Sequence, residues 1–364
     1  MVSSSSDHGG LRVEPLSNEQ EWEDFVQHSP KGTFFHTLKW KEILRHHFPL
    51  EPAYLVVRET SGAVVGVCPF VIRHELGVFS VLESLPHSDY AGPLVTEGYA
   101  SSIMKALTTH LAEMARSKHV TYAKVRFSDN DLSRLFGAGK SRVDTSAGTM
   151  VVDLEQTPPD VVWNNALNSS RRRQIRLMER DGFQVKTCES IDDLNSFYVL
   201  YRGAMEYIGA YHFPHAFLLD AFDTLYPDNF NVFLMAKDNR VFAGMAFYVY
   251  KPAKTVYQTL IGIDRTGKYP GLPYIYMSWH FIKWAEALGY RYVSLGATPS
   301  NPNETGYGLK SRLGAEFVQD YFLYYPFNRP LFLAREIAEK LWRHTGSRLP
   351  RGIASRLLNL AQSR

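Results

Sequence analysis

Hydrophobic and polar positions along the chain follow one order of patterns twice. In the second half they predict, in this order, a strand at 255–263, a turn rich in glycine and proline at 265–271, a helix at 273–288, a strand at 292–296 and a loop-and-turn segment at 306–316. In the first half the same slots hold a strand at 79–85, a turn at 87–93, a helix at 99–117 and a strand at 122–127. Because alternation with period two indicates strands and period 3.6 indicates helices, we expect two copies of one α/β unit.

Further segments complete each unit. In the first half, Ser17 and Gln20 have the spacing of a capping box ahead of a helix at 21–28. The remaining elements expected there are a helix at 40–47 and strands at 53–58, 64–73 and 150–154. The second half adds helices at 191–207 and about 214–225, and strands at 183–187, 231–237 and 241–250. A duplicated unit of this kind supplies a cleft between its copies.

A basic helix is expected between the two units. The segment 160–180 has a helical pattern that is interrupted at 168–170 and carries a run of arginines. On a helix Arg172 and Arg176 share a face, and Arg173 lies beside Arg176. Arg173 and Arg176 are therefore candidates to pair with phosphates or with acids of either unit. A solvated helix face is the alternative.

Composition is consistent with two cores. A chain of 364 residues with 45% hydrophobic residues is long enough for two domains. We find no apolar run of about 20 residues that would span a membrane and no signal peptide, and we expect the first ten residues to form a flexible leader. The two cysteines, Cys68 and Cys188, favour buried thiols in a reducing cytosol, and no Cys/His spacing suggests zinc.

Positive charge is concentrated at the C-terminal end. From Arg329 to Arg364 there are eight Lys or Arg and two Glu, which gives +6 and leaves about −3 for the rest of the formal net charge of +3. The same stretch has the apolar stripe of amphipathic helices. It is expected to dock on the body of the protein or, alternatively, to contact an anionic membrane surface or a phosphate-rich partner. A body near −3 argues against an extended tRNA-binding surface.

The turn at 265–271 has features of an anion site. A strand leads into a glycine-containing loop and then into a helix, so backbone amides and the helix N-terminus can face a phosphate. Arg265 would add a cation, but Pro270 and Pro273 remove two amide donors. Pyrophosphate binding and an ordinary connecting turn both remain open.

Four stretches, in order, resemble the FemABX-type peptidyltransferases and their FemAB-related, GNAT-fold relatives, over nearly all of residues 12–327. They are Thr33-Phe-Phe-His-Thr-Leu-Lys-Trp40, Asp89-Tyr-Ala-Gly-Pro93, the arginine-rich 163–176 ending in Asp181-Gly182, and Gly308-Leu-Lys310 with Leu313-Gly-Ala-Glu316. The resemblance implies two tandem GNAT-type units with the substrate cleft between them. It also implies transfer of an aminoacyl group, usually from an aminoacyl-tRNA, to an amine on a cell-wall precursor. Relatives transfer acyl groups from coenzyme A to sugars or polysaccharide precursors.

The same resemblance suggests roles for individual residues. Lys310 occupies the place of the family's lysine near the reacting carbonyl, and Lys39 and Lys41 lie near its cationic position for a diphosphate. Two positions depart from the family pattern. Tyr207 stands where an arginine is common, and Thr96 stands where an acid often follows the Gly-Pro turn. Both departures weaken the expectation of a nucleotide-linked muropeptide as substrate.

The chemistry of amide formation adds further candidates. Transfer to an amine needs a positioned ester or thioester and a cation facing the developing oxyanion, which Lys310 can supply. No Ser-His-Asp or Cys-His pattern supports a covalent acyl-enzyme. Asp264 is a candidate base, with substrate-assisted proton transfer as an equal alternative. Tyr207 and Tyr211 flank Gly209 and are candidates to line the cleft, or they pack in the core or on the surface.

These observations together predict a cytoplasmic, possibly membrane-peripheral, FemAB-like transferase that needs no bound cofactor. Its donor would be an aminoacyl-tRNA or an acyl-CoA as co-substrate, and its acceptor a small or lipid-linked amine. The expected organisation is a disordered leader at 1–11, GNAT-like domains at 12–157 and 183–327, a connecting helix at 158–182 and a basic helical tail at 328–364. The alternatives are an acyl-CoA-dependent N- or O-acetyltransferase acting on a sugar or polysaccharide precursor, and a non-catalytic tandem GNAT-like binding protein.

Overall fold

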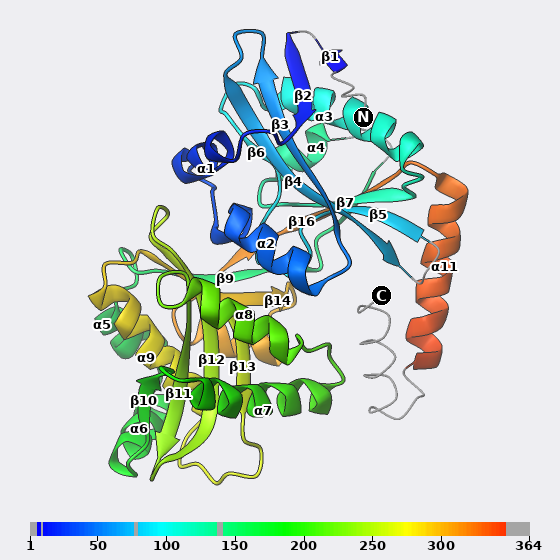
Figure 1. Ribbon diagram of the computed structural model, residues 1–364. Helices are drawn as coiled ribbons and strands as arrows, with labels where there is room; N and C mark the ends of the chain where they lie inside the picture. The colour runs from blue at the N-terminus through cyan, green and yellow to red at the C-terminus, as the bar shows by residue number, and fades with distance from the viewer. Residues whose placement is uncertain (1–5, 9, 76–78, 137–140, 347–364) are drawn as a thin grey trace. The chain divides into compact units, whose positions relative to one another are not determined.

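The computed structural model describes residues 6–8, 10–75, 79–136 and 141–346. They form two compact units, each built on a mixed β-sheet with helices packed against it (Figure 1). Of these described residues, unit 1 contains those up to Thr145 and those at 320–346, whereas unit 2 contains Ser146–Gln319. The predicted α/β class with two units is confirmed.

The described part of unit 1 contains a nine-stranded sheet in the order β1-β2-β3-β4-β5-β7-β16-β8, with β6 paired to β4. The strands are β1 (Ser6–His8), β2 (Leu11–Pro15), β3 (Glu51–Glu59), β4 (Val64–Glu75), β5 (Phe79–Ser84), β6 (Leu94–Val95), β7 (Tyr122–Phe127), β8 (Arg142–Asp144) and β16 (Tyr321–Pro326). The helices are α1 (Glu19–His28), a short 3-10 turn (Phe34–His36), α2 (Leu38–His47), α3 (Ala100–Ser117), α4 (Asn130–Leu135) and α11 (Arg329–Gly346). Alternate residues of β7, such as Val125, share a core with Leu107 and Leu111 of α3.

Unit 2 contains a seven-stranded sheet in the order β10-β11-β12-β13-β14-β9-β15. The strands are β9 (Ala147–Asp153), β10 (Gln184–Thr187), β11 (Phe230–Lys237), β12 (Arg240–Tyr250), β13 (Thr255–Ile263), β14 (Tyr292–Pro299) and β15 (Glu316–Gln319). The helices are α5 (Pro159–Val161), a π-helical turn (Val162–Ala166), α6 (Ser169–Arg180), α7 (Ile191–Ile208), α8 (His215–Leu225), α9 (Pro273–Ala287) and α10 (Thr305–Ser311). Neighbouring residues of β12 face opposite ways, because Gly244 lies against Phe197 of α7 while Met245 shares a core with Ile275 of α9.

Each sheet contains one strand whose residues lie outside the range that the sequence suggested for that unit. Strand β9 pairs with β14 and β15 of unit 2, and β16 lies between β7 and β8 of unit 1. The expected boundaries at 157 and 327 therefore need correction. Residues 146–157 and the connecting helix at 158–182 belong to unit 2, and residues 320–346 return to unit 1. Alternation shows that a segment is a strand, but it does not identify the neighbour to which that strand pairs.

Three local predictions are wrong. The N-cap of α1 is Asn18 rather than Ser17, and its side chain accepts hydrogen bonds from two amides of the first turn. Residues 6–8, predicted to belong to a disordered leader, form β1 against β2, while residues 1–5 and 9 lie outside the described residues. The predicted loop-and-turn at 306–316 is mostly the helix α10, followed by the start of β15.

The first helix of the basic tail docks on unit 1. Phe332 of α11 is buried against Val81 and Tyr122, and the Arg335 guanidinium donates to the Glu75 carboxylate at 3.1 Å. The docking interpretation therefore holds for this part of α11, and residues 347–364 lie outside the described residues. No helix among residues 6–346, as far as they are described, combines the length and the apolar character needed to cross a membrane.

Two of the stretches that carry the family resemblance form one structural unit in unit 1. The buried His36 ring lies 2.9 Å from the Gly92 carbonyl oxygen through Nε2, so this nitrogen carries the proton and donates. The Thr33 hydroxyl donates to the Tyr90 carbonyl at 2.8 Å, and the Trp40 indole donates to the Ser88 hydroxyl at 2.8 Å. These bonds fix the 88–92 turn against the start of α2.

Gly92 allows this turn to approach β7. A Cβ atom at position 92 would overlap the backbone carbonyl oxygen of Arg126, which cannot move without shifting the strand. We expect Gly92→Ala to lower the free energy of unfolding of unit 1 by at least about 2 kcal/mol, because the clash is with backbone. Gly203→Ala is the control, since α7 leaves open space there, and it should be neutral or slightly stabilising. Urea unfolding followed by far-UV circular dichroism, which reports on both units, measures both variants, and equal effects would contradict the assignment.

His36 should make unit 1 sensitive to acid. Burial lowers the pKa of His36 to about 4, although its bond to Gly92 opposes the shift. In the unfolded chain His36 takes up a proton near pH 6.5, whereas in the folded chain it does so only near pH 4. The unfolded state therefore binds more protons between these pH values, so the free energy of unfolding falls as the pH drops through this range. We expect the stability advantage of the wild type over His36→Gln to shrink by up to roughly 3 kcal/mol between pH 7 and pH 4. Denaturant unfolding of both proteins across this range measures it, and a pH-independent difference would contradict it.

Candidate functional site

The two parallel strands at the centre of unit 2 separate after a short contact. Strands β13 and β14 pair only from Thr255 to Tyr257 and from Tyr292 to Ser294. Beyond that point β13 continues along β12 alone, and β14 continues along β9 alone. The strands leave an opening between their carboxyl ends, which we call the fork. Separation at such a point exposes backbone amides and carbonyls that a ligand can pair with, as in the crevices of other open α/β sheets.

Irregularities in both strands maintain the fork. Along β13 the pairing passes from Gln258 to Leu260, so Thr259 is the extra residue of a bulge. Along β14 the register shifts between Ser294 and Ala297, where Gly296 adopts a φ of +77°. A residue in this left-handed region is strained unless it is glycine. The divergence of the strands is therefore encoded locally.

Lys310 of α10 reaches the bulge of β14. Its ammonium nitrogen lies 3.0 Å from the Gly296 carbonyl oxygen and 2.7 Å from that of Ala297, and it donates to both. A cation is thereby held at the edge of the fork. Lys310 lies in the last turn of a helix, not after a flexible Gly-x-Gly loop as the sequence suggested.

Four buried polar side chains of β13, α9 and β14 lie around the fork, namely Gln258, Tyr274, Ser278 and Thr298, and we call them the fork cluster. Tyr274 lies beside Gln258 and Ser278, but no hydrogen bond of good geometry satisfies the buried polar atoms of the four. Burial raises the pKa of Tyr274 to about 12, while the adjacent Gln258 and Ser278 side chains oppose the shift. Tyr274 therefore keeps its proton at neutral pH and can donate. Buried polar groups are normally satisfied, so such a group of orphans indicates a place where a ligand or water supplies the missing bonds.

Sequence reasoning did not single out the fork cluster, although signals were present. Tyr274 and Ser278 are four residues apart on α9, so they share a face of a helix that is otherwise apolar on its buried side. Gln258 is the amide-bearing residue of a strand that is otherwise apolar or hydroxyl-bearing. A polar residue at a position that the pattern assigns to the core is the feature that could have identified them.

In unit 1 the end of the equivalent parallel strand pair is occupied by ion pairs. Strands β5 and β7 are parallel up to the pair Glu83 and Lys124. The buried Glu83 carboxylate accepts from Lys124 at 2.7 Å and from Arg73 at 2.5 Å. Burial alone would raise the pKa of Glu83, but these two cations outweigh it and lower the pKa to about 2. Because this position is filled by charged side chains that satisfy one another, the candidate site is the fork of unit 2.

Asp264 has a structural role in the turn after β13. Its carboxylate accepts from the amide and hydroxyl of Thr266 at 2.8 and 2.7 Å and from Arg240 at 2.8 Å. The Thr266 hydroxyl bond is the main reason that its pKa is lowered, with Arg240 adding to it. A carboxylate that is engaged by three donors is a weak proton acceptor. We therefore withdraw Asp264 as the candidate base.

Arg265 and Tyr207 are brought together, as their assignment to a shared site requires. The Arg265 guanidinium lies 3.4 Å from the centre of the Tyr207 ring, in a cation–π contact. Tyr211 lies farther along, stacked with His212, and burial raises its pKa to about 12. Tyr211 is half-buried among aromatic rings, which matches the packing alternative for this residue.

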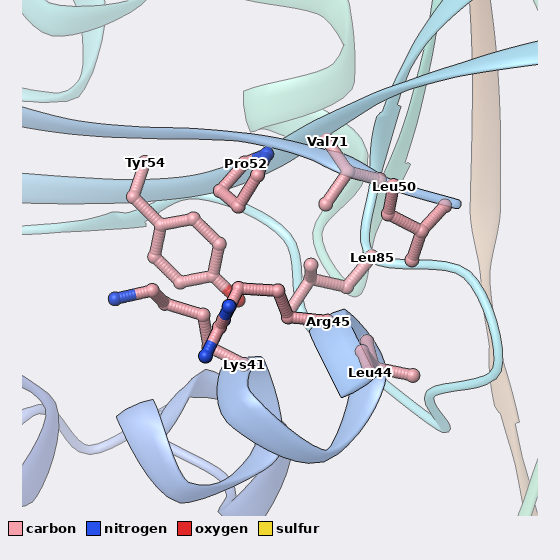
Figure 2. Close-up of a pocket in the computed structure, with 8 residues that line it drawn as sticks. All are labelled: Lys41, Leu44, Arg45, Leu50, Pro52, Tyr54, Val71 and Leu85. Carbon is pink, nitrogen blue, oxygen red and sulfur yellow. The ribbon is translucent and has the colours of Figure 1, made fainter. Parts of the chain in front are cut away.

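The two lysines of α2 differ in surroundings. Lys39 is exposed, whereas Lys41 lies 3.5 Å from both Glu19 and Glu42 and 5.7 Å from the centre of the Tyr54 ring. Figure 2 shows Lys41 and Arg45 beside Tyr54 at a hollow between α2 and the strands of unit 1. This hollow has a volume of about 10 Å³, enough for one water molecule at most. Within unit 1 alone, Lys41 therefore has no space for a diphosphate beside it.

The arginines of α6 mainly stabilise the break in the connecting helix. Arg172 donates to three backbone oxygens, including that of Leu167 at 2.6 Å, and Arg176 lies over the Trp163 ring at 5.3 Å. The interruption falls where it was predicted, with Asn168 capping α6. Arg173 is exposed, so the solvated alternative describes it better than a phosphate contact within unit 2.

Residues 164–307 match the family of acetyltransferase (GNAT) domains. The match lies within unit 2, and this unit therefore has the fold of a GNAT domain. The match contains β10 to β14 and α9, and hence both strands of the fork, and it ends just before Lys310. No curated protein matches the sequence at a significant level.

Solved structures extend the likeness to most of the chain. FemX is similar with a TM-score of 0.67 and 15% identity, over 88% of this chain and 98% of that one. The C-terminal domain of a protein described as a lysylphosphatidylglycerol synthetase, from Agrobacterium fabrum, has a TM-score of 0.57, 12% identity and coverages of 89% and 95%. A tandem GNAT protein from the clavulanic acid biosynthesis pathway has a TM-score of 0.56, 15% identity and coverages of 86% and 97%. The expected fold of two tandem GNAT-like units, and the resemblance to FemAB-related proteins, are confirmed.

The backbone at Gly296 offers a direct test of the fork. A Cβ atom there would lie 3.1 Å from the Gln258 carbonyl oxygen and 4.0 Å from the Lys310 ammonium, in addition to the strain of a positive φ. Gly289, at the end of α9, has nearly the same φ of +75° but open space around it. We expect Gly289→Ala to cost about 1 kcal/mol of stability and Gly296→Ala to cost more and to reduce acyl transfer. Unfolding and turnover measurements on both variants check this, and equal behaviour of the two would contradict a close contact across the fork.

Proposed function

We propose that the protein transfers an aminoacyl or acyl group to an amine of a cell-envelope precursor, without a covalent acyl-enzyme. The observation that carries the proposal is the fork of unit 2, in which Lys310 and the fork cluster surround the separated ends of β13 and β14. FemX and the lysylphosphatidylglycerol synthetase domain, which share this fold, support the choice of acceptor class.

The fork supplies what amide formation requires. The amine nitrogen attacks the carbonyl carbon of the ester or thioester, and the C–N bond forms as the C–O or C–S bond breaks. The amine gives up a proton, and the leaving alcohol or thiol takes one up. Charge develops on the carbonyl oxygen in the transition state, and a preorganised cation or hydroxyl donor is worth most there. Lys310 and Tyr274 are the two donors at the fork that fit this role.

The available nucleophiles support direct transfer. Burial raises the pKa of both cysteines, that of Cys188 to about 12, so neither forms a thiolate at neutral pH. With Asp264 engaged in its turn, proton removal assisted by the substrate or by solvent is the favoured route. No cofactor is needed for this chemistry, and the donor acts as co-substrate.

Two donor classes fit the fold, and each has its own support. An aminoacyl-tRNA is favoured by the likeness to FemX over nearly the whole chain. An acyl-CoA, used for N- or O-acetylation of a sugar or polysaccharide precursor, is favoured by the acetyltransferase domain match and by the tandem GNAT protein. A cytoplasmic location accompanies either donor.

Lys310 tests the proposal. We expect Lys310→Met to lower kcat/KM for transfer by about 100-fold or more, because it removes the cation while keeping the side chain's length. Lys283→Met is the matched control, since Lys283 lies on α9 over the Trp279 ring, and it should keep full activity. Labelled acetyl-CoA and charged tRNA, each offered with amine acceptors, identify the donor in the same assay.

Folding must be separated from catalysis in this experiment. Lys310 also satisfies two carbonyl groups, so thermal unfolding of each variant is measured alongside turnover. Lys310→Arg retains hydrogen-bond donors and should stay folded, while its larger planar head alters the geometry at the fork. Full activity of a folded Lys310→Met with both donors would overturn the proposed role.

A further inference from the structure

Helix α11 turns its charged side toward unit 1. The Arg335 side chain is only 11% exposed, and its guanidinium donates to the Glu75 carboxylate at 3.1 Å and pairs with Glu339 of the same helix. The neighbouring Glu336 carboxylate lies 3.5 Å from the Arg142 guanidinium of β8. Both acids of α11 are therefore engaged by arginines on the side of the helix that packs against the sheet (Figure 1).

The opposite side of α11 is aliphatic. Pro330, Leu333, Ala334 and Ile337 are all exposed, Leu333 by 57% and Ile337 by 60%, and we call these four residues the outer face. Spacings of three and four place them together on one side of a helix. A surface helix normally buries its apolar side and leaves its charged side in water. Apart from the buried Phe332, α11 does the reverse, and such a group of aliphatic side chains marks an interaction surface.

Cations lie at both ends of the outer face. Arg329, four residues before Leu333, and Lys340, three residues after Ile337, are both exposed. These four residues form a single row along the helix, because spacings of three and four bring side chains to the same side. From Lys340 to the end of the chain the sequence contains six Lys or Arg and no Asp or Glu. Positive charge is therefore concentrated beside the aliphatic side chains.

An anionic lipid surface matches both properties of this side of the helix. Aliphatic side chains enter the boundary between headgroups and acyl chains, and lysines and arginines beside them attract acidic headgroups. A second copy of the chain fits less well. Two outer faces that meet across a twofold axis bring the cations at their ends together, whether the helices run parallel or antiparallel. Like charges at such a contact repel, and no acid of the outer face offsets them.

We infer that α11 holds unit 1 on an anionic lipid surface, with the outer face at the acyl boundary and Arg329 and Lys340 among the headgroups. The buried Phe332 and the ion pair of Arg335 with Glu75 connect this attachment to the sheet of unit 1. The helix then lies along the lipid surface and does not cross it. The inference goes beyond the transfer reaction, since it concerns where the protein acts and uses no residue of the fork.

Co-sedimentation of the full chain with vesicles tests the inference. Vesicles of phosphatidylcholine with about one third phosphatidylglycerol are compared with vesicles of phosphatidylcholine alone. We expect the partition coefficient to be at least about tenfold larger for the anionic vesicles. In about 0.5 M salt it should fall toward the value for the neutral vesicles, because salt screens the attraction.

One pair of substitutions tests the aliphatic part of the surface. Leu333→Gln combined with Ile337→Gln keeps good helix formers on α11 and should lower the partition coefficient on anionic vesicles about tenfold or more. Ile191→Gln combined with Val199→Gln is the matched control, since these aliphatic residues of α7 are 48% and 60% exposed. The control should bind like the wild type.

A second pair tests the charge. Arg329→Gln combined with Lys340→Gln should lower the partition coefficient on anionic vesicles about tenfold and leave that on neutral vesicles unchanged. Lys105→Gln combined with Arg116→Gln is its control, because these exposed cations of α3 have the same separation along a helix of unit 1. This control should behave like the wild type on both kinds of vesicle.

Thermal unfolding of every variant is measured alongside, to show that unit 1 stays folded. Failure of the full chain to bind anionic vesicles, or folded α11 variants that bind as well as their matched controls, would overturn the inference. A dimer that Leu333→Gln with Ile337→Gln dissociates in analytical ultracentrifugation, without vesicle binding, would assign the outer face to self-association instead. Because none of these measurements needs a donor or an acceptor, their result is independent of the effect of Lys310→Met on turnover.

Discussion

The separation of two parallel strands is the constraint on which the candidate site depends. If β13 and β14 stayed paired along their full length, their backbone groups would satisfy one another and leave nothing to bind a substrate. The bulge at Thr259, the left-handed Gly296 and the two bonds from Lys310 act on the same few residues to keep them apart. Lys310 thus has a structural reason to be at the fork that is independent of any catalytic one.

Comparison of the two units shows how a repeated fold can carry different chemistry. The parallel pair of unit 1 ends in Glu83 and Lys124, which neutralise each other in the interior. The parallel pair of unit 2 ends in Tyr257 and Ser294, which are neutral, and orphaned polar atoms lie beyond them. A buried ion pair is costly to break and leaves no group to serve a ligand, whereas unsatisfied neutral groups gain from one. Local sequence, not topology, therefore locates the candidate site in unit 2.

The sequence predicted elements well where burial imposes a regular pattern. The bounds of β7 and β13 agree with the structure because each strand begins with buried residues and then alternates between buried and partly buried positions up to its end. Helix α10 was missed because Gly306 and Gly308 suggested a turn, yet nothing crowds Gly308, and the helix is anchored through Lys310. The fork could not be predicted from the pattern, because where two strands separate depends on pairing registers that alternation does not encode.

The exchange of strands also bears on how the chain folds. Strand β16 lies between β7 and β8, so the sheet of unit 1 is complete only when residues after unit 2 have joined it. Its pairing brings Tyr321 opposite Phe127 and buries Leu323 in the core of unit 1, and this contact spans nearly 200 residues. Such non-local pairing is slow because a long loop must close before the contact forms. The two units are therefore not independent halves, and a protein cut at the boundary that the sequence suggested would lack β16, the inner strand that joins β8 to the rest of the first sheet.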